Sequence, residues 1–493
     1  MVRAEDRSLG RQSVMIDNDA TTAEKICAES CRRFTSPTTS PLPLSITRNF
    51  IWTLGGNVTG AACHWALIVL LAKIASAEIL GEFALASAVA VPITFLADFR
   101  LRVLFVTDVA GKYPFREMLG LRFILACVSI TVILVSCSIA GYQGSTTFII
   151  LAVGIAQLAD FISDSYYGKF QRDERMDRIA RSLIIRNILA ATAFTIAVYF
   201  THNLVWGVCG LVLGKGLVLL LYDARKGAPE LDARADVNGH SLRQQTYFDG
   251  LQPAWNFRRQ LQMVWVAFPL AIASILVSVN GYLPRYVLES FVGRRGLGIY
   301  SAINYIPSGC FMVALALGYA VFARLAKLFA KGDLAGFKLL LIKLAGVYAG
   351  GGVAGVLLSA VAGRQLLTIM YRPEYAQHVD LLRWLTIVGA VNCLTTAMQC
   401  GLTAASQFRV QVPLFAGVTA ISLAGCFILV PRMGLAGAAL AMLISSIVQL
   451  CASACLVFWT MVKRARELKN MECQQLEPDR IPLPFADNFP TEA

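Results

Sequence analysis

Charged residues inside long apolar stretches are the parts of this sequence that could do chemistry. Asp98 and Arg102 lie four residues apart near the end of one such stretch, and Asp160 and Asp164 have the same spacing in another. This spacing places two side chains on one face of a helix. An arginine there can hold a phosphate through two parallel hydrogen bonds, and a buried carboxylate can exchange a proton or bind a cation. Asp98 and Asp160 are therefore ion-coupling candidates, and Arg102 is a candidate anion-binding residue.

The same residues also have a purely structural interpretation. Asp98 and Arg102 can pair with each other and fix the depth of a helix in a membrane. Asp160 can pair with Arg186, which lies at a similar depth in the following apolar stretch. Lys215 lies near the end of its own stretch, so its long side chain can extend to water. The sequence leaves both interpretations open.

Uncharged polar residues form a second group of candidates. Asn57 and His64 lie in the first apolar stretch, and His64 is too far from either end to reach water. A histidine at that depth either contacts a solute and exchanges a proton or bonds to a neighbouring helix. Two later stretches meet at a short loop, where we expect polar side chains to converge for binding or for packing with an aromatic belt. These residues are Asn280, Arg285, Asn304 and Tyr305.

The elements that must position these residues are membrane-spanning helices. Of the 493 residues, 56% are hydrophobic and 15% are charged, and the mean hydropathy is +0.60. This composition excludes a cytosolic enzyme, a disordered protein and a secreted disulfide scaffold. It predicts an all-α multi-pass membrane protein of about twelve helices, because apolar windows of about 20 residues span the hydrocarbon core. The windows are 49–72, 82–104, 119–141, 145–168, 182–200, 203–222, 262–283, 297–322, 339–361, 381–402, 411–430 and 434–460.

Basic residues predict which side of the membrane each loop occupies. With the N-terminus inside, 32 of the 44 Lys and Arg residues lie on the inner side and 7 on the outer side. This bias predicts that both termini are cytoplasmic, and it explains the net charge of +13 without a nucleic-acid partner. The predicted parts are a disordered cytoplasmic tail (1–48), a first lobe of six helices (49–222), a cytoplasmic linker (223–261), a second lobe (262–460) and a C-terminal cytoplasmic tail (461–493).

The two sets of six helices show signs of an internal duplication. Trp52 and Trp265 occupy similar positions in the first and seventh spans. Gly81 and Gly298 each precede an aromatic residue by two positions and open the second and eighth spans. An even number of helices per copy predicts parallel repeats, with a binding site in a central cleft between the lobes.

No catalytic or cofactor signature accompanies these helices. The chain has no nucleotide-binding P-loop, its four histidines lack metal-ligand spacing, and its 13 cysteines show no framework. The predicted outer loops are too short to hold the machinery of a membrane glycosyltransferase or polymerase. We expect no enzymatic activity, no cofactor and no metal.

Several motifs of the chain resemble the polysaccharide-unit flippases of the multidrug/oligosaccharidyl-lipid/polysaccharide (MOP) exporter superfamily. The similarity covers about residues 45–460, and many members have a glycine where this chain has Arg100. The motifs are Asn49–Asn57 (NFIWTLGGN), Leu80–Phe83 (LGEF), Leu96–Arg102 (LADFRLR), Pro284–Tyr286 (PRY), Gly296–Ser301 (GLGIYS), Tyr371–Tyr375 (YRPEY) and Pro431–Gly437 (PRMGLAG).

The resemblance implies a MATE-like pair of six-helix bundles around a cavity that opens to alternate sides. Such proteins move undecaprenyl-diphosphate-linked oligosaccharides across a bacterial inner membrane, for O-antigen, exopolysaccharide or capsule synthesis. The expected partners are the lipid-linked oligosaccharide, the bilayer, and the polymerase and chain-length proteins of the pathway. Arg102 and Arg285 would contact the diphosphate, with Asn57, His64 and the later polar residues along the cleft. Rival interpretations are a cation-coupled multidrug exporter, a peptidoglycan-precursor flippase, and a membrane-embedded glycosyltransferase or polymerase.

Overall fold

The computed structural model describes residues 46–108, 112–227, 252–405 and 408–475. They lie in one compact unit that begins at Ile46. Most of the predicted N-terminal tail, most of the linker and the end of the C-terminal tail lie outside the described residues. Every regular element in the described ranges is a helix, which confirms the all-α prediction.

A helix occupies each of the twelve predicted spans, and α11 contains two of them. Ten helices within the described ranges are long and apolar enough to cross a membrane. The sidedness of the loops stays a prediction. The elements are α2 (Ile46–Ile74), α3 (Ala77–Asp98), α4 (Leu101–Thr107), α5 (Phe115–Ile139), α6 (Ser145–Arg172), α7 (Met176–Thr201), α8 (Leu204–Val218), η1 (Leu219–Asp223), α9 (Ala224–Gly227), α11 (Phe257–Ala330), α12 (Leu334–Met370), η3 (Pro373–His378), α13 (Val379–Ala404), α14 (Phe408–Met433) and α15 (Leu435–Gln475).

Two predicted helix ends are wrong, because in both places the helix continues beyond the predicted span. The predicted outer loop 284–296 is helical apart from a kink at Gly293, which has φ 80° and ψ 178°. Only glycine adopts this conformation readily, so Gly293 lets two helices join without a loop. At the other end of the chain, α15 continues to Gln475, well into the predicted tail. Helices can continue past the apolar window because polar side chains remain helical in water.

The second span is broken where the sequence predicted a continuous helix. α3 ends at Asp98, and the next two residues, Phe99 and Arg100, have φ values of 41° and 51° before α4 begins. Non-glycine residues rarely adopt positive φ, at a cost of about 1–3 kcal/mol each. The break rotates α4 relative to α3, which removes Asp98 and Arg102 from a common helix face.

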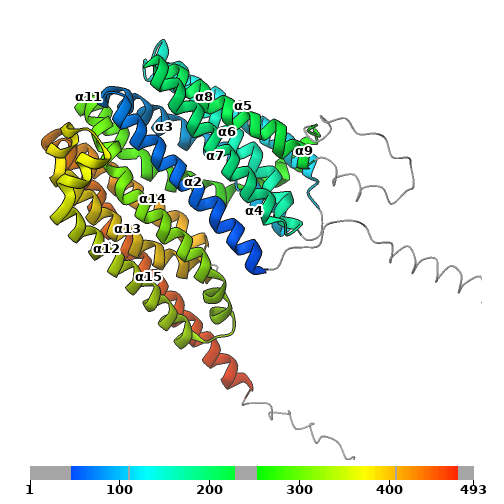
Figure 1. Cartoon of the computed structure of the whole chain (residues 1–493). Coiled ribbons are helices and arrows are strands. Elements are labelled where there is room, and N and C mark those ends of the chain that lie inside the picture. The colour runs from blue at the N-terminus through cyan, green and yellow to red at the C-terminus, as the bar shows by residue number, and fades with distance from the viewer. Residues whose placement is uncertain (1–45, 109–111, 228–251, 406–407, 476–493) are drawn as a thin grey trace, which may run out of the picture. The chain divides into compact units, whose positions relative to one another are not determined.

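The helices pack in two groups joined by α3 and α11. In the first group α2 packs on α7, α7 on α8, and α6 on α3, α5 and α8; in the second group α12 packs on α13, and α15 on both α13 and α14. The two groups are visible in Figure 1, with α11 lying along α3. The buried apolar residues of both groups form a continuous cluster where α3 meets α11. Many apolar side chains on the outer faces are exposed, as expected for surfaces that contact lipid.

Two glycines allow α3 and α11 to approach closely. A Cβ on Gly81 would lie 1.9 Å from the carbonyl oxygen of Arg294, and one on Gly298 would lie 1.9 Å from that of Ala77. Gly81 and Gly298 are the residues matched by the internal repeat, and Ala77 and Arg294 have the same separation in sequence. The contact is therefore reciprocal, like the interface of a two-fold dimer. This reciprocity supports the inference of duplicated halves.

Candidate functional site

A fully buried arginine lies at the centre of the first charged cluster. Arg122 of α5 is 0% exposed, and its guanidinium donates to the carbonyl oxygens of Ala97 and Asp98 (2.8 and 3.0 Å) and to Ser165 Oγ (3.1 Å). It also lies within ion-pair distance of the carboxylates of Asp98 (3.6 Å) and Asp164 (3.7 Å). By donating to the last carbonyls of α3, Arg122 stabilises that helix end beside the break. One side chain thereby connects α5, α3 and α6.

The predicted ion pair between Asp98 and Arg102 does not form. Arg102 Nη1 instead contacts Asp164 Oδ1 at 2.8 Å, and its Nε donates to Gln171 Oε1 at 2.9 Å. The backbone break at Phe99 and Arg100 is the physical reason, because it turns Arg102 toward α6. In this arrangement Arg102 has two partners, so it would contact a phosphate only by leaving Asp164.

The predicted pair between Asp160 and Arg186 is present, with a third member. Arg186 Nε lies 3.3 Å from Asp160 Oδ1, and Lys215 Nζ lies 2.6 Å from Asp160 Oδ2. The prediction that Lys215 extends to water is wrong, because its side chain is only 14% exposed and pairs with Asp160. The ring of Tyr167 lies beneath the guanidinium groups of both Arg186 and Arg102, at 5.6 and 5.9 Å. The two charged clusters are therefore neighbours.

A different kind of cation lies where α2 meets α11. Arg285 is 7% exposed, its guanidinium carbon lies 4.5 Å from the ring centre of Tyr282 and 5.9 Å from that of Tyr305, and no described carboxylate forms an ion pair with it. The imidazole of His64, on α2, meets the ring of Tyr305 edge-on at 5.5 Å. The structure thus brings three predicted site residues together, His64, Arg285 and Tyr305. Tyr282 joins them.

The three predicted asparagines are less closely associated. Asn280 lies in α11 and has a buried Oδ1 without a described hydrogen-bond donor. Asn304 lies on the other side of the Gly293 kink, and its carbonyl oxygen accepts from Ser308 at 2.7 Å. Asn57 is exposed on α2 and donates to the carbonyl oxygen of Thr53 at 2.8 Å. The Oδ1 of Asn280 therefore remains free to accept a hydrogen bond from a ligand.

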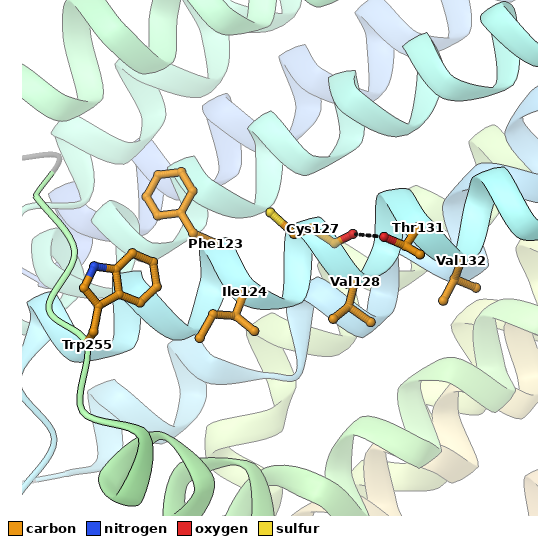
Figure 2. Close-up of a pocket in the computed structure, with 7 residues that line it drawn as sticks. All are labelled: Phe123, Ile124, Cys127, Val128, Thr131, Val132 and Trp255. Carbon is orange, nitrogen blue, oxygen red and sulfur yellow. Dashed lines mark hydrogen bonds between the residues drawn. The ribbon is translucent and has the colours of Figure 1, made fainter.

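The open groove in Figure 2 lies elsewhere and has a different character. It has a volume of about 420 Å³ and runs along one face of α5, with Trp255 at one end. Thr131 Oγ1, its one polar side-chain oxygen, donates to the carbonyl oxygen of Cys127 at 3.0 Å. The lining is Phe123, Ile124, Cys127, Val128, Thr131, Val132 and Trp255. A charged solute would find no partner there, so the groove is not the counterpart of the Arg285 cluster.

Several buried charged residues were not identified as candidates from the sequence, and two of them, Arg122 and Asp223, are 0% exposed. Arg122 stands alone in a strongly apolar window, which is itself a signal of a buried partner. Asp223 closes the sixth helix and is 0% exposed, but it lies at the boundary of the predicted linker and was therefore assigned to water. No group of three or more His, Cys, Asp or Glu in the described ranges is arranged to hold a metal ion.

Comparisons with known proteins agree with this architecture. No family model matches the chain. The chain is 24% identical, over 408 residues, to the capsular polysaccharide biosynthesis protein CapF of Staphylococcus aureus. This alignment covers 82% of the chain and 97% of the relative.

Solved structures of transporters share the fold. An inward-facing multidrug resistance MATE transporter of the MOP superfamily covers 89% of this chain and 98% of its own, with a TM-score of 0.59 and 13% identity. The outward-facing form covers 85% and 96% with a TM-score of 0.55, again at 13% identity. A MOP transporter from Pyrococcus furiosus, described as having a binding pocket of reversed polarity, covers 84% and 96% with a TM-score of 0.54 and 13% identity.

The sequence and fold similarities together confirm the family resemblance and the MATE-like fold. The ten apolar helices of the described ranges and the fold shared with MATE transporters indicate a multi-pass membrane protein. The chain shares the fold of MATE transporters of the MOP superfamily and is similar in sequence to a capsular polysaccharide biosynthesis protein.

Proposed function

We propose that the protein moves undecaprenyl-diphosphate-linked oligosaccharides from the cytoplasmic to the periplasmic leaflet of a bacterial inner membrane by alternating access. The MATE-like fold supports transport, and the named function of the curated relative supports a role in polysaccharide biosynthesis. The required partners are the lipid-linked oligosaccharide and the bilayer, with the polymerase and chain-length proteins of the pathway acting after it.

The observation that carries this proposal is the environment of Arg285. An unpaired charge buried in protein costs several kcal/mol unless a partner compensates it. The titratable groups that face Arg285 in α11 are the phenols of Tyr282, Tyr300 and Tyr305, and none of them is a carboxylate. An anionic ligand would supply the missing partner. A diphosphate matches the planar guanidinium, because it can accept two parallel hydrogen bonds.

Neighbouring groups suit the rest of such a ligand. The phenols of Tyr282 and Tyr305 and the amide of Asn280 present donors and acceptors that fit sugar hydroxyls. His64 reaches the same cluster from α2, so groups from both halves of the chain meet there. A cation-coupled exporter of cationic drugs would instead need a carboxylate facing its ligand, and the charge at this position is positive. This sign favours the lipid diphosphate over the multidrug alternative.

The proposal is tested by removing the cation in a strain that lacks the chromosomal gene. We expect Arg285→Ala to reduce surface polysaccharide at least about tenfold, the effect of losing about 1.4 kcal/mol of ligand binding. Lipid-linked units should accumulate in the inner leaflet at the same time. Arg285→Lys should retain part of the activity, because it keeps the charge but loses bidentate binding and stacking. Polysaccharide and lipid-linked units are measured at equal protein levels.

The matched control is Arg258→Ala, which removes an exposed arginine from the start of the same helix. This control should export normally. The double variant Arg102→Ala, Arg285→Ala tests the two predicted diphosphate contacts together. Wild-type polysaccharide from the double variant would rule out the roles assigned to these residues, and normal levels of undecaprenyl intermediates in the deletion strain would rule out the flippase function.

A further inference from the structure

The sixth membrane helix ends in a buried carboxyl group that no ion pair accounts for. After α8 the chain forms the π-helical segment η1, where the backbone N–H of Ala224 donates to the carbonyl of Leu219, five residues earlier. Asp223, the last residue of η1, is 0% exposed, and neither carboxylate oxygen has a hydrogen-bond donor within the described ranges. By contrast, the buried Asp98 and Asp177 each lie within 4.0 Å of an arginine.

The π turn is what directs this side chain inward. One extra residue in the turn rotates the positions that follow, and such turns often mark functional positions in helices. Asp223 consequently faces the hydroxyl groups of Ser163 on α6 and Ser182 on α7. Ser163 Oγ is itself without a described partner, while Ser182 Oγ is 2.7 Å from the hydroxyl of Tyr167. The carboxyl group therefore lies among hydroxyls, with one of them unused.

Charged groups near Asp223 are already engaged with another carboxylate. Arg186 and Lys215 both contact Asp160, so two cations share one anion. Arg186 Nε and Nη1 nevertheless have no described hydrogen-bond acceptor, and Asp223 lies beyond ion-pair distance. The titratable groups facing Asp223 are Asp160, Tyr166 and Tyr167 from α6, Arg186 from α7, and Tyr222 from its own segment.

These contacts are compatible with two states of the cluster. With a proton on Asp223, the neutral acid can donate to Ser163, and Arg186 remains on Asp160. Without the proton, an ionised carboxylate would be buried among hydroxyl groups with no cation beside it, at a cost that an approaching Arg186 can offset. Lys215 would then neutralise Asp160 alone. The ionised state balances two anions against two cations.

We propose that Asp223 is a proton-binding site, with Ser163 and Ser182 accepting from or donating to its carboxyl group and Arg186 as the counter-ion of its ionised form. Proton release breaks the O–H bond of the acid, and water takes up the proton. Arg186 then exchanges Asp160 for Asp223, which changes how α7 is tied to α6 and to the end of the sixth helix. The site lies apart from Arg285 and does not depend on the identity of the transported anion.

The test uses the purified full-length chain and the apolar carbodiimide dicyclohexylcarbodiimide, which reacts with protonated carboxyl groups in apolar surroundings. Peptide mass spectrometry then measures modification at each aspartate as a function of pH. We expect Asp223 to be modified at low pH and protected as the pH rises, whereas the ion-paired Asp98 should remain unmodified throughout. If NaCl protects Asp223 from modification, and choline chloride at equal ionic strength does not, the proposal is overturned in favour of a sodium site.

Thermal unfolding of Asp223→Asn provides the second readout, because asparagine mimics the neutral acid in size and charge. The wild-type protein should lose stability as the pH rises through the titration of Asp223, since the folded state must then bury a charge. The variant should show a smaller pH dependence and match the wild type at low pH. Equal pH dependence in the two proteins, together with an unmodified Asp223, would refute the proposal.

Discussion

At the scale of single residues, Arg122 is the clearest structural cation of the chain. Its removal would leave the carboxylates of Asp98 and Asp164 and the last carbonyls of α3 without their buried partner. Breaking a buried pair in this way costs about 3–5 kcal/mol. We therefore expect Arg122→Ala to lower the midpoint of thermal unfolding strongly in detergent solution.

The control for this prediction is Arg383→Ala. Arg383 pairs with Asp380 at 3.0 Å, but its side chain is 48% exposed and that of Asp380 is 87% exposed. Exposed pairs of this kind contribute about 0–1 kcal/mol. A midpoint for Arg122→Ala that is no lower than that of Arg383→Ala would contradict the structural role of Arg122.

The sequence predicted some of these pairings and missed others for a physical reason. The Asp160–Arg186 pair could be predicted because it joins two continuous helices that run in opposite directions. The depth of each residue in the membrane then follows from its distance to the end of its helix. The partner of Arg102 could not be predicted, since neither glycine nor proline marks the break at Phe99 and Arg100. The family resemblance implies a glycine in many members at the position of Arg100, where this chain has φ 51°. A residue at positive φ explains that preference.

At the scale of helices, the glycine contact between α3 and α11 gives a direct prediction. Gly81→Ala would place a Cβ 1.9 Å from a backbone carbonyl oxygen of α11, which cannot move without shifting the helix. Overpacking of this kind typically costs about 1–3 kcal/mol. We expect a lower unfolding midpoint for Gly81→Ala and for Gly298→Ala.

Gly281 supplies a matched control on the same long helix. A Cβ there would meet no atom within 4 Å, so Gly281→Ala should keep or raise stability through the higher helix propensity of alanine, by up to about 1 kcal/mol. Similar losses in all three variants would show that the effect does not come from the α3–α11 contact.

Helix positions were predictable from hydropathy, whereas helix ends were not. Apolar windows report the length that the hydrocarbon requires, and a helix is free to continue beyond it, as α12 and α15 do. Hydropathy also failed to predict that the seventh and eighth spans form the single long helix α11, in which a kink at Gly293 takes the place of the predicted loop. Arg285 consequently lies inside a helix, not at a loop, which accounts for its burial.

At the scale of the whole chain, polar contacts join the two halves at both ends: Arg259 and Glu117 pair at 3.0 Å near the predicted inner side, and a second set lies at the end predicted to be outside. Glu82 Oε1 lies 3.6 Å from Arg294 Nη1, Tyr142 donates to Glu289, and Arg372 donates to the last carbonyls of α2. The last two contacts are reciprocal, since each joins a loop of one half to the first helix of the other half. Such symmetry is expected when duplicated halves close against each other at one end.

If these contacts hold the outer end closed, removing one should shift the protein toward a state open at that end. Arg294 is 42% exposed, so its pair with Glu82 contributes at most about 1 kcal/mol, enough for about a fivefold change in population. We expect Arg294→Ala to increase hydrogen–deuterium exchange in peptides covering 77–83 and 292–298. The charge swap Glu82→Arg, Arg294→Glu should restore protection, because it rebuilds the pair.

A contact at the opposite end provides the contrasting variant. Arg100 Nε donates to Ser274 Oγ at 2.8 Å, which joins the two groups near the predicted inner side. Arg100→Ala should therefore leave exchange in the outer peptides unchanged or lower, while raising it in peptides around Ser274. Faster exchange at both ends in both variants would indicate general loosening of the fold, and would contradict an alternation between states closed at opposite ends.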